Sequence, residues 1–204
     1  MTEDEAKLWV AKKFDAATVE RLTHFVDLLL TGTTHQNLIA PSTVDTVWVR
    51  HIVDSLQLLD LAPQDWSHWA DIGSGAGLPG LVVATACDRQ VTLIEPRRLR
   101  VEFLNACIAA IELSNVSVIQ AKAETAKLDY ADVVSARAVA KLDTLFAGSR
   151  RFTSPETLFI LPKGESAHSE VATARTSWHG RFHVEQSIVD PKSGIVVARD
   201  VTRR

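Results

Sequence analysis

The residues best suited to chemistry in this chain form a glycine-rich segment that runs from Asp71 to Gly80. An apolar run over residues 66–72 enters the segment, and a helix-like stretch follows it. Its three alternating glycines are Gly73, Gly75 and Gly77. A strand that ends in such a turn and feeds a helix presents backbone N–H groups to a bound ligand, and glycine permits the close approach. Glu95 closes the next apolar run, where an acidic side chain can accept hydrogen bonds from ribose hydroxyls. The pattern predicts a nucleoside cofactor at the carboxyl edge of a parallel sheet.

The spacing of the glycines indicates which cofactor to expect. The dinucleotide fingerprint is G-x-G-x-x-G, whereas this chain has G-x-G-x-G with a proline two residues further on. Asp71 precedes the first glycine by two residues, and its carboxylate would repel a pyrophosphate but attract a sulfonium. We therefore expect S-adenosylmethionine, bound by Asp71, the three glycines and Glu95. An NAD-dependent oxidoreductase and a glycine turn without a ligand are the alternatives.

A second polar group lies in the predicted helix before this segment. Arg50 and Asp54 are one turn apart, and His51 lies between them. On spacing alone, Arg50 and Asp54 are best explained as a surface ion pair. His51 is equally compatible with a contact to a substrate base and with a structural role. The remaining histidines form no ligand cluster, so we predict no metal site.

Strand and helix signals alternate from residue 66 onward, which is typical of a parallel sheet with helices on both faces. We expect strands at 67–72, 91–95, 116–120, 132–136, 157–162, 182–188 and 194–200, and helices at 79–87, 97–112, 122–127, 141–150 and 165–178. The last two strands are too close for a helix between them and should form an antiparallel hairpin at one edge. This order resembles the Rossmann-like methyltransferase fold of the α/β class, with a mostly parallel seven-stranded sheet.

The first 62 residues are predicted to be an N-terminal helical extension, followed by a methyltransferase domain over residues 63–204. Apolar residues recur on one helix face from Val19 to Leu29, and Gly32 is expected to end that helix. A second helix should begin at Ser42, a good N-cap residue, and stop at Pro63.

Charge and composition restrict the possible partners. The net charge of −3 argues against indiscriminate binding of nucleic acid. An RNA partner therefore requires a local basic patch, for which the candidates are Arg50, Arg98, Arg100, Arg137 and Lys163. No apolar run approaches the roughly 20 residues that span a bilayer, and the acidic N-terminus is unlike a signal peptide. Both cysteines lie in apolar helical stretches and are expected to be reduced, so we expect a cytoplasmic protein. A monomer is the default.

Six segments, taken together and in this order, carry a resemblance to a known family. They are Asn37-Leu38-Ile39-Ala40, Arg50-His51-Ile52-Val53-Asp54-Ser55-Leu56, Asp71 to Gly80, Arg98-Leu99-Arg100-Val101-Glu102-Phe103-Leu104, Ser135-Ala136-Arg137-Ala138 and Lys163-Gly164. The chain resembles the RsmG family (glucose-inhibited division protein B), which methylates N7 of one guanine in bacterial 16S ribosomal RNA. The match runs from about residue 20 to the C-terminus.

This resemblance implies roles for particular residues. Gly73 and Leu78 would contact S-adenosylmethionine, and Glu95 would face its ribose. Three further residues would complete the cofactor pocket, with the first two bordering the adenine: Ala123, Glu124 and Arg137. One departure from the family pattern is Pro162, which precedes Lys163 where an aliphatic residue is usual.

The implied reaction needs no acid–base catalysis at its nucleophile. Guanine N7 has an exposed lone pair and no proton, so no general base is needed, and the main task is to align N7 with the methyl donor. Asp54, held by Arg50, is the candidate for a contact near the base, with His51 beside it. Arg137 and Lys163, at the ends of predicted strands, suit a phosphodiester. The expected substrate is 16S ribosomal RNA or a small-subunit particle. A methyltransferase for a small molecule or protein, and a noncatalytic ribosome-binding factor with this fold, are the alternatives.

Overall fold

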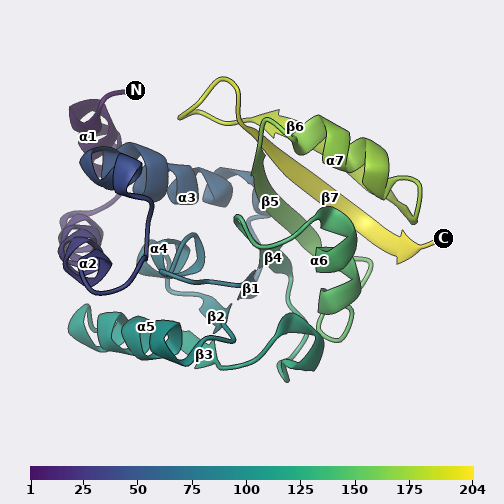
Figure 1. Ribbon diagram of the computed structural model, residues 1–204, viewed down its shortest axis with the longest axis horizontal. Helices are drawn as coiled ribbons and strands as arrows, with labels where there is room; N and C mark the ends of the chain where they lie inside the picture. The colour runs from purple at the N-terminus through teal and green to yellow at the C-terminus, as the bar shows by residue number, and fades with distance from the viewer.

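The computed structural model describes residues 1–204, and its centre is a seven-stranded sheet (Figure 1). The strands are β1 (His68–Ile72), β2 (Gln90–Ile94), β3 (Val116–Ile119), β4 (Val133–Ser135), β5 (Leu158–Gly164), β6 (Trp178–Gln186) and β7 (Gly194–Arg203). Their order in the sheet is β3-β2-β1-β4-β5-β7-β6. The first five strands pair in parallel, and β7 is antiparallel to both β5 and β6. The predicted fold class and the C-terminal hairpin are confirmed, with β7 inside the sheet and β6 at its edge.

The order of the strands explains where a ligand site belongs. The chain leaves β1 toward β2 on one side and toward β4 on the other, so β1 and β4 flank a topological switch point. Asp71 pairs with Ser135 across this point, and Ile72 pairs with Ile94 on the opposite side of β1. The loops that follow β1, β2 and β4 therefore meet at one edge of the sheet.

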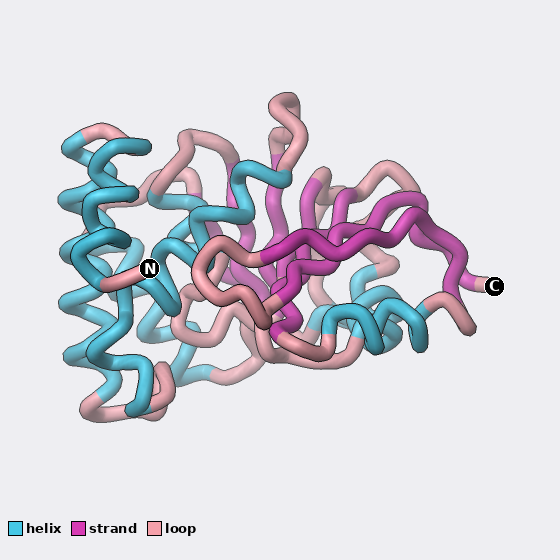
Figure 2. The backbone as a smooth tube through the Cα atoms, turned by 90° about the horizontal axis from the view of Figure 1, so that it is seen from above, coloured by secondary structure: helices cyan, strands magenta, loops and turns pink.

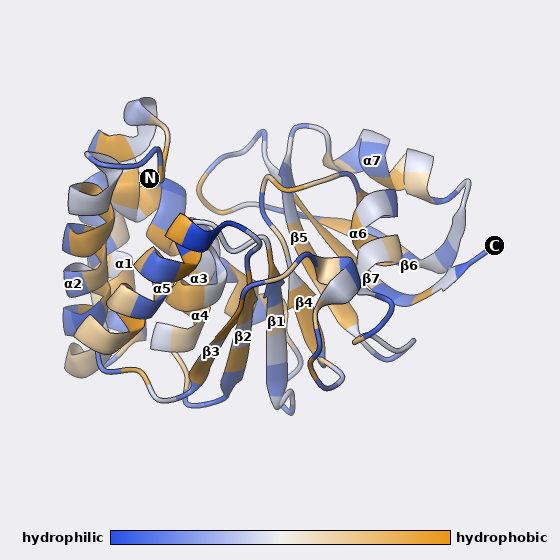
Figure 3. Ribbon diagram, turned by 60° about the horizontal axis from the view of Figure 1, so that its bottom comes forward, coloured by the Kyte–Doolittle hydropathy of each residue, from blue (hydrophilic) through white to orange (hydrophobic).

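Helices cover both faces of the sheet, as Figures 2 and 3 show. One face carries α4 (Gly80–Thr85) and α5 (Arg98–Ala110), and the other carries α6 (Leu142–Ser149) and α7 (Ala167–Ala174). Side chains alternate between the two faces along each strand. Trp69 joins the apolar cluster under α4, for example, whereas Ala70 joins the cluster under α6. None of the helices is long and apolar enough to cross a membrane.

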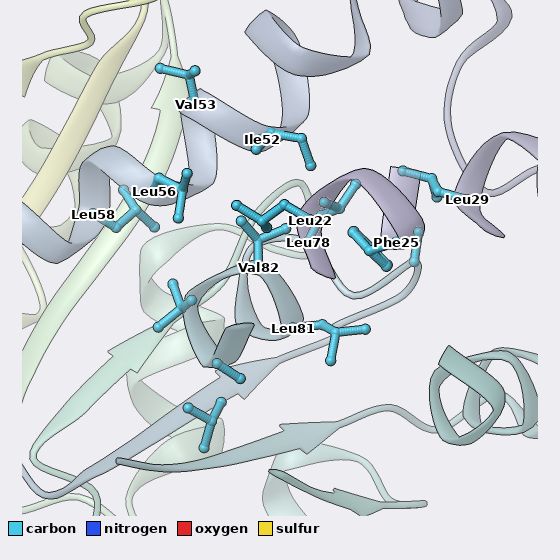
Figure 4. Packing of buried hydrophobic residues seen from close by; sticks show 14 of the residues in the cluster. Leu22, Phe25, Leu29, Ile52, Val53, Leu56, Leu58, Leu78, Leu81 and Val82 are labelled. Atoms are coloured by element: carbon cyan, nitrogen blue, oxygen red, sulfur yellow. The ribbon is translucent and has the colours of Figure 1, made fainter. Parts of the chain in front are cut away.

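The N-terminal segment adds a further layer outside α4. It comprises α1 (Glu3–Lys13), α2 (Ala16–Thr33), η1 (Pro41–Thr46), η2 (Trp48–Val53), α3 (Asp54–Leu56) and η3 (Gln57–Leu61). Leu22, Phe25 and Leu29 of α2 pack toward Leu78 and Leu81 (Figure 4), within a single apolar cluster that continues into the sheet. The predicted division at residues 62 and 63 falls in the loop between η3 and β1.

Two predicted helix boundaries differ from the structure. Helix α2 ends at Thr33, one residue after Gly32, and Gly32 is needed for packing: a Cβ at Gly32 would come within 2.7 Å of Leu38 and 2.8 Å of Phe103. Ser42 caps nothing, because the helical segment begins at Pro41 with Ala40 in the N-cap position.

The expected single helix from Ser42 to Pro63 is also irregular. It consists of 3₁₀, π, α and again 3₁₀ turns. At the start of its π-helical part, the carboxylate of Glu3 in α1 accepts hydrogen bonds from the backbone N–H groups of Trp48 and Val49. A contact made from 45 residues away on the chain leaves no local sequence signal.

Candidate active site

The glycine turn after β1 is built on residues with positive φ. Gly73, Gly75 and Gly77 have φ values of 66°, 53° and 87°, a region that side chains other than glycine rarely occupy. The N–H of Gly75 donates to Glu95 Oε2 at 2.9 Å, and the N–H of Arg97 donates to Glu95 Oε1 at 2.8 Å. A carboxylate can accept about four hydrogen bonds. Glu95 therefore joins the loops after β1 and β2 and still has acceptor capacity for a ligand.

Asp71 supports this turn from below and does not line the cavity in front of it. Its carboxylate accepts hydrogen bonds from the Ser135 hydroxyl at 2.6 Å and from the Gly80 N–H at 3.2 Å. Trp69 Nε1 donates in turn to Ser135 Oγ at 2.8 Å. The expectation that Asp71 faces the charged end of the cofactor does not fit this geometry, since the side chain is fully buried. Its contacts fix the start of α4 relative to β1.

Burial raises the pKa of Asp71 from 3.8 to about 6, although its hydrogen bonds oppose the shift. The folded protein therefore binds this proton more strongly than the unfolded chain does. Stability falls as pH rises from about 4 through 6, and above that range the loss is complete. In Asp71→Asn this dependence is absent. The difference in the free energy of unfolding between the parent and the variant should therefore shift by about 2 kcal/mol, at the expense of the parent, between pH 4 and pH 7.

Urea unfolding of both proteins across this pH range would measure the effect. The exposed Asp65→Asn is the matched control, for which the profile should follow that of the parent. Parallel profiles for Asp71→Asn and the parent would contradict the assignment of the buried charge.

A cavity of about 1030 Å³ runs from the glycine turn across the ends of β4 and β5 to the turn between β6 and β7. Most of the predicted site residues lie on its wall, namely Gly73, Gly75, Leu78, Glu95, Arg50, His51, Asp54, Arg137 and Lys163. The structure thus brings together residues from the N-terminal helical segment and from four strand ends.

Three further predicted cofactor residues lie off this wall. A Cβ at Gly77 would meet Leu81 and Leu104, so this glycine allows the turn to pack on α4 and α5. Ala123 and Glu124 form the short η4 turn (Ala123–Thr125) after β3, in place of the helix expected over 122–127. The Glu124 side chain lies over Gly148 of α6, where an added Cβ would be 3.2 Å from its carboxylate. Their contact with adenine stays a prediction.

A charged cluster occupies the middle of the cavity wall. Arg137 Nη1 donates to Asp54 Oδ2 at 3.0 Å and to the backbone oxygen of Arg50 at 3.1 Å. Arg137 Nη2 lies 3.1 Å from His51 Nδ1. Arg50 itself pairs with Asp190 in the β6–β7 turn, with Nη1 and Oδ2 separated by 3.1 Å. The predicted helical pair of Arg50 and Asp54 is therefore absent, and each residue binds a partner far away in sequence.

The other predicted cations also have partners. Lys163 Nζ lies 3.0 Å from Glu170 Oε2 and donates to the Ala140 carbonyl. Only 8% of its side chain is exposed, so Lys163 is placed to hold the loop before α6.

The two arginines at the start of α5 differ in surroundings. Arg98 is exposed and pairs with Glu102, whereas the guanidinium of Arg100 donates to the Asn37 carbonyl. Arg100 Nη1 is the single buried side-chain donor without a partner in the structure.

Several residues that build the site carried no usable signal in the sequence. Gln57 is buried, donates to Asp54 and Ser187, and accepts from the N–H of Ile188, which attaches the β6–β7 turn to the helical segment. Glu170 and Asp190 supply the partners of the two cations. Ser135 belongs to the Ser135–Ala138 motif, but its contact with Asp71 depends on the pairing of β1 with β4, which only the structure shows.

Comparisons with known proteins agree over nearly the whole chain. Residues 18–196 match the family model GidB, described as rRNA small subunit methyltransferase G. The chain belongs to this family. A relative from Novosphingobium aromaticivorans, named ribosomal RNA small subunit methyltransferase G, is 48% identical and covers 98% of this chain and 89% of its own length. A relative of the same name from Zymomonas mobilis is 41% identical, and the match covers 98% of this chain and 95% of the relative. The predicted membership of the RsmG family is confirmed.

Solved structures confirm the fold. A SAM-dependent methyltransferase from Aquifex aeolicus superposes with a TM-score of 0.62 at 13% identity, covering 83% of this chain and 98% of that one. The M. jannaschii protein TYW2, solved in complex with AdoMet, gives a TM-score of 0.57 at 17% identity, with 76% of each chain covered. Membership of this methyltransferase family establishes S-adenosylmethionine as the cofactor.

The turn itself fits that cofactor. A Cβ at Gly75 would meet nothing closer than the Gly73 carbonyl at 3.7 Å, so the space in front of the turn is open. Glu95 stands beside it with unused acceptor capacity. Gly75 and Glu95 would hold the nucleoside part, and Leu78 offers an apolar wall.

Proposed function

We propose that this protein transfers a methyl group from S-adenosylmethionine to N7 of a guanine in 16S ribosomal RNA. The observation that carries the proposal is the family match over residues 18–196, which includes the glycine turn, the Arg50–Asp54 segment and Arg137. The named relatives act on small-subunit ribosomal RNA. The chemistry of the cavity supports N7 of guanine as the methylated atom.

Guanine N7 carries no proton, so the reaction needs no general base from the cavity wall. His51 is 8% exposed, and both of its ring nitrogens lie within hydrogen-bond distance of protein groups. Burial, together with the charges of Arg137 and Arg50, lowers the pKa of His51 to about 3. His51 is therefore neutral at physiological pH. When bound, S-adenosylmethionine supplies an electrophilic methyl group, and the residues of this chain position the guanine.

The length of the cavity supports two adjacent ligands. Its β1–β2 end contains the glycine turn and Glu95, and its other end is formed by the β6–β7 turn and the end of β5. The Asp54–Arg137 pair lies between these ends, about 17% exposed at Arg137 and 16% at Asp54. We place the guanine at this pair. The Asp54 carboxylate can stabilise the positive charge that the guanine acquires on methylation.

The same polar wall weighs against the other candidates. A methyltransferase for an apolar substrate would need a pocket without charged groups at its centre, whereas the side chains of Asp54 and Arg137 line the middle of this one. A noncatalytic ribosome-binding factor would not need an open cofactor turn. A monomer acting in the cytoplasm, where it meets ribosomal particles, completes the proposal.

Incubation with methyl-labelled S-adenosylmethionine and small subunits that lack the modification would test the function. We expect label in 16S RNA as 7-methylguanosine at one position, detected by strand scission at that base. Naked 16S RNA, assayed in parallel, distinguishes RNA from assembled particles as the substrate. Label in another nucleoside would contradict the N7 assignment, and label in no RNA would favour the noncatalytic alternative.

Phosphate contacts predict a dependence on salt, because each neutralised phosphate releases counterions. Arg98 is the best residue for this test, since its side chain is 70% exposed and pairs only with Glu102, which is on the same helix. We expect Arg98→Glu to weaken binding to small subunits and to reduce the slope of log K against log salt by about one. The exposed Arg21→Glu on α2 is the charge-matched control. Equal effects of the two variants would exclude α5 from the RNA-binding surface.

A further inference from the structure

Thr43 lies on the cavity wall behind His51 and takes no part in any motif. Its hydroxyl lies 2.8 Å from His51 Nε2 and donates to the Ala40 carbonyl at 2.8 Å. A hydroxyl has one proton and two acceptor lone pairs. With its proton directed at Ala40, the Thr43 oxygen can accept a hydrogen bond from His51 Nε2–H.

The other ring nitrogen of His51, Nδ1, faces Arg137. A neutral imidazole has one N–H donor and one acceptor nitrogen, so a proton on Nε2 leaves Nδ1 as the acceptor. Arg137 Nη2 lies 3.1 Å from Nδ1, and a guanidinium can only donate. Because Arg137 can only donate, the hydrogen bonds from Arg137 through His51 and Thr43 to Ala40 run in one consistent direction when the His51 proton is on Nε2.

The N–H donors of Arg137 show how these hydrogen bonds hold its guanidinium. A guanidinium has five N–H donors, and His51, Asp54 and the Arg50 carbonyl use three of them. The remaining donors, at Nε and Nη2, have no partner in the protein, and Arg137 lines the cavity. The guanidinium is thus anchored on one side and open to a ligand on the other.

We propose that Thr43 is a positioning residue of the methyl-transfer site: it selects the His51 tautomer that orients Arg137. This inference rests on the proposed function for the reaction that Arg137 serves. Without the acceptor at Thr43, the Nε2–H of a nearly buried imidazole is unpaired, which favours the tautomer with a proton on Nδ1. That proton would point at Arg137 and displace its guanidinium.

The tautomer can be observed directly in the folded protein. Long-range ¹H–¹⁵N spectra of protein labelled at histidine should show His51 with its proton on Nε2, assigned by the signal that disappears in His51→Asn. In Thr43→Val, which keeps the side-chain shape, the Nδ1–H form should appear. A parent spectrum with the proton on Nδ1 would overturn the proposal.

The kinetic test is a double-mutant cycle on the single-turnover rate of 16S methylation. Thr43→Val should lower the rate about tenfold, the scale of one lost hydrogen bond, and Thr43→Ser should restore most of it. In His51→Asn the amide oxygen takes the place of Nδ1 and nothing remains for Thr43 to bind. Thr43→Val should therefore have no further effect in that background.

Thr46→Val, an exposed change in the same 3₁₀ turn, is the matched control and should leave the rate at the parent value. An unchanged rate in Thr43→Val, or an equal loss in the His51→Asn background, would overturn the positioning role. Failure of the proposed function looks different, because the parent protein itself would then transfer no methyl group to 16S RNA.

Discussion

Gly75→Asp is expected to abolish binding of S-adenosylmethionine while the protein stays folded. Gly75 has a φ of 53°, which aspartate tolerates better than most residues. Its Cβ would point into open space, with the Gly73 carbonyl at 3.7 Å as its nearest neighbour. The new carboxylate would therefore occupy the cofactor's place beside Glu95. We expect affinity to fall by about 100-fold or more, equivalent to about 3 kcal/mol.

Calorimetric titration would measure the affinity, and thermal unfolding would check the fold. Gly75→Ala is the matched variant, since it places a Cβ at the same positive φ without adding a charge or a longer side chain, and its affinity should fall far less. Binding of the cofactor by Gly75→Asp at parent affinity would remove this turn from the site.

Gly80→Ala is expected to have the largest effect on stability. A Cβ at Gly80 would come within 2.5 Å of both Asp71 Cβ and Leu93 Cδ2, and within 2.7 Å of Asp71 Oδ2. All three atoms belong to buried residues of the sheet, which cannot move away without disturbing β1 and β2. We expect a loss of about 3 kcal/mol in the free energy of unfolding, from overpacking.

Gly164→Ala separates this effect from backbone strain. Gly164 has a φ of 59° and no atom within 4 Å of an added Cβ, so the change should cost about 1 kcal/mol. Urea unfolding of both variants would give the two values. A cost for Gly80→Ala no larger than that for Gly164→Ala would mean that the close contact relaxes freely.

The sequence was most informative where residues close together in the chain determine the backbone geometry. Alternating glycines after an apolar run predicted the turn at Gly73–Gly77, and Glu95 at the end of the next run was correctly placed beside it. Both follow from local rules, because parallel strands end at the same edge of a sheet. The hairpin of β6 and β7 was predicted because the segment between the expected strands 182–188 and 194–200 is too short for a helix.

The partners of the charged side chains could not be predicted in the same way. Arg50 and Asp54 had ideal helical spacing, yet they bind Asp190 and Arg137, which are 140 and 83 residues away. Asp71 was expected in the cavity because of its charge, but Ser135 on the neighbouring strand makes a buried position possible. Such pairings depend on tertiary packing, and a single sequence has no signal for them.

The shared core of α2 and α4 has a consequence for exchanging segments between homologues. A recombination crossover at residues 62 and 63 follows the apparent boundary of the N-terminal helices. It would nevertheless combine Leu22, Phe25 and Leu29 of one parent with Leu78 and Leu81 of the other. Buried volumes would then match only by coincidence. We therefore expect a stable chimera to require that the N-terminal helices and the Leu78–Leu81 surface come from the same parent.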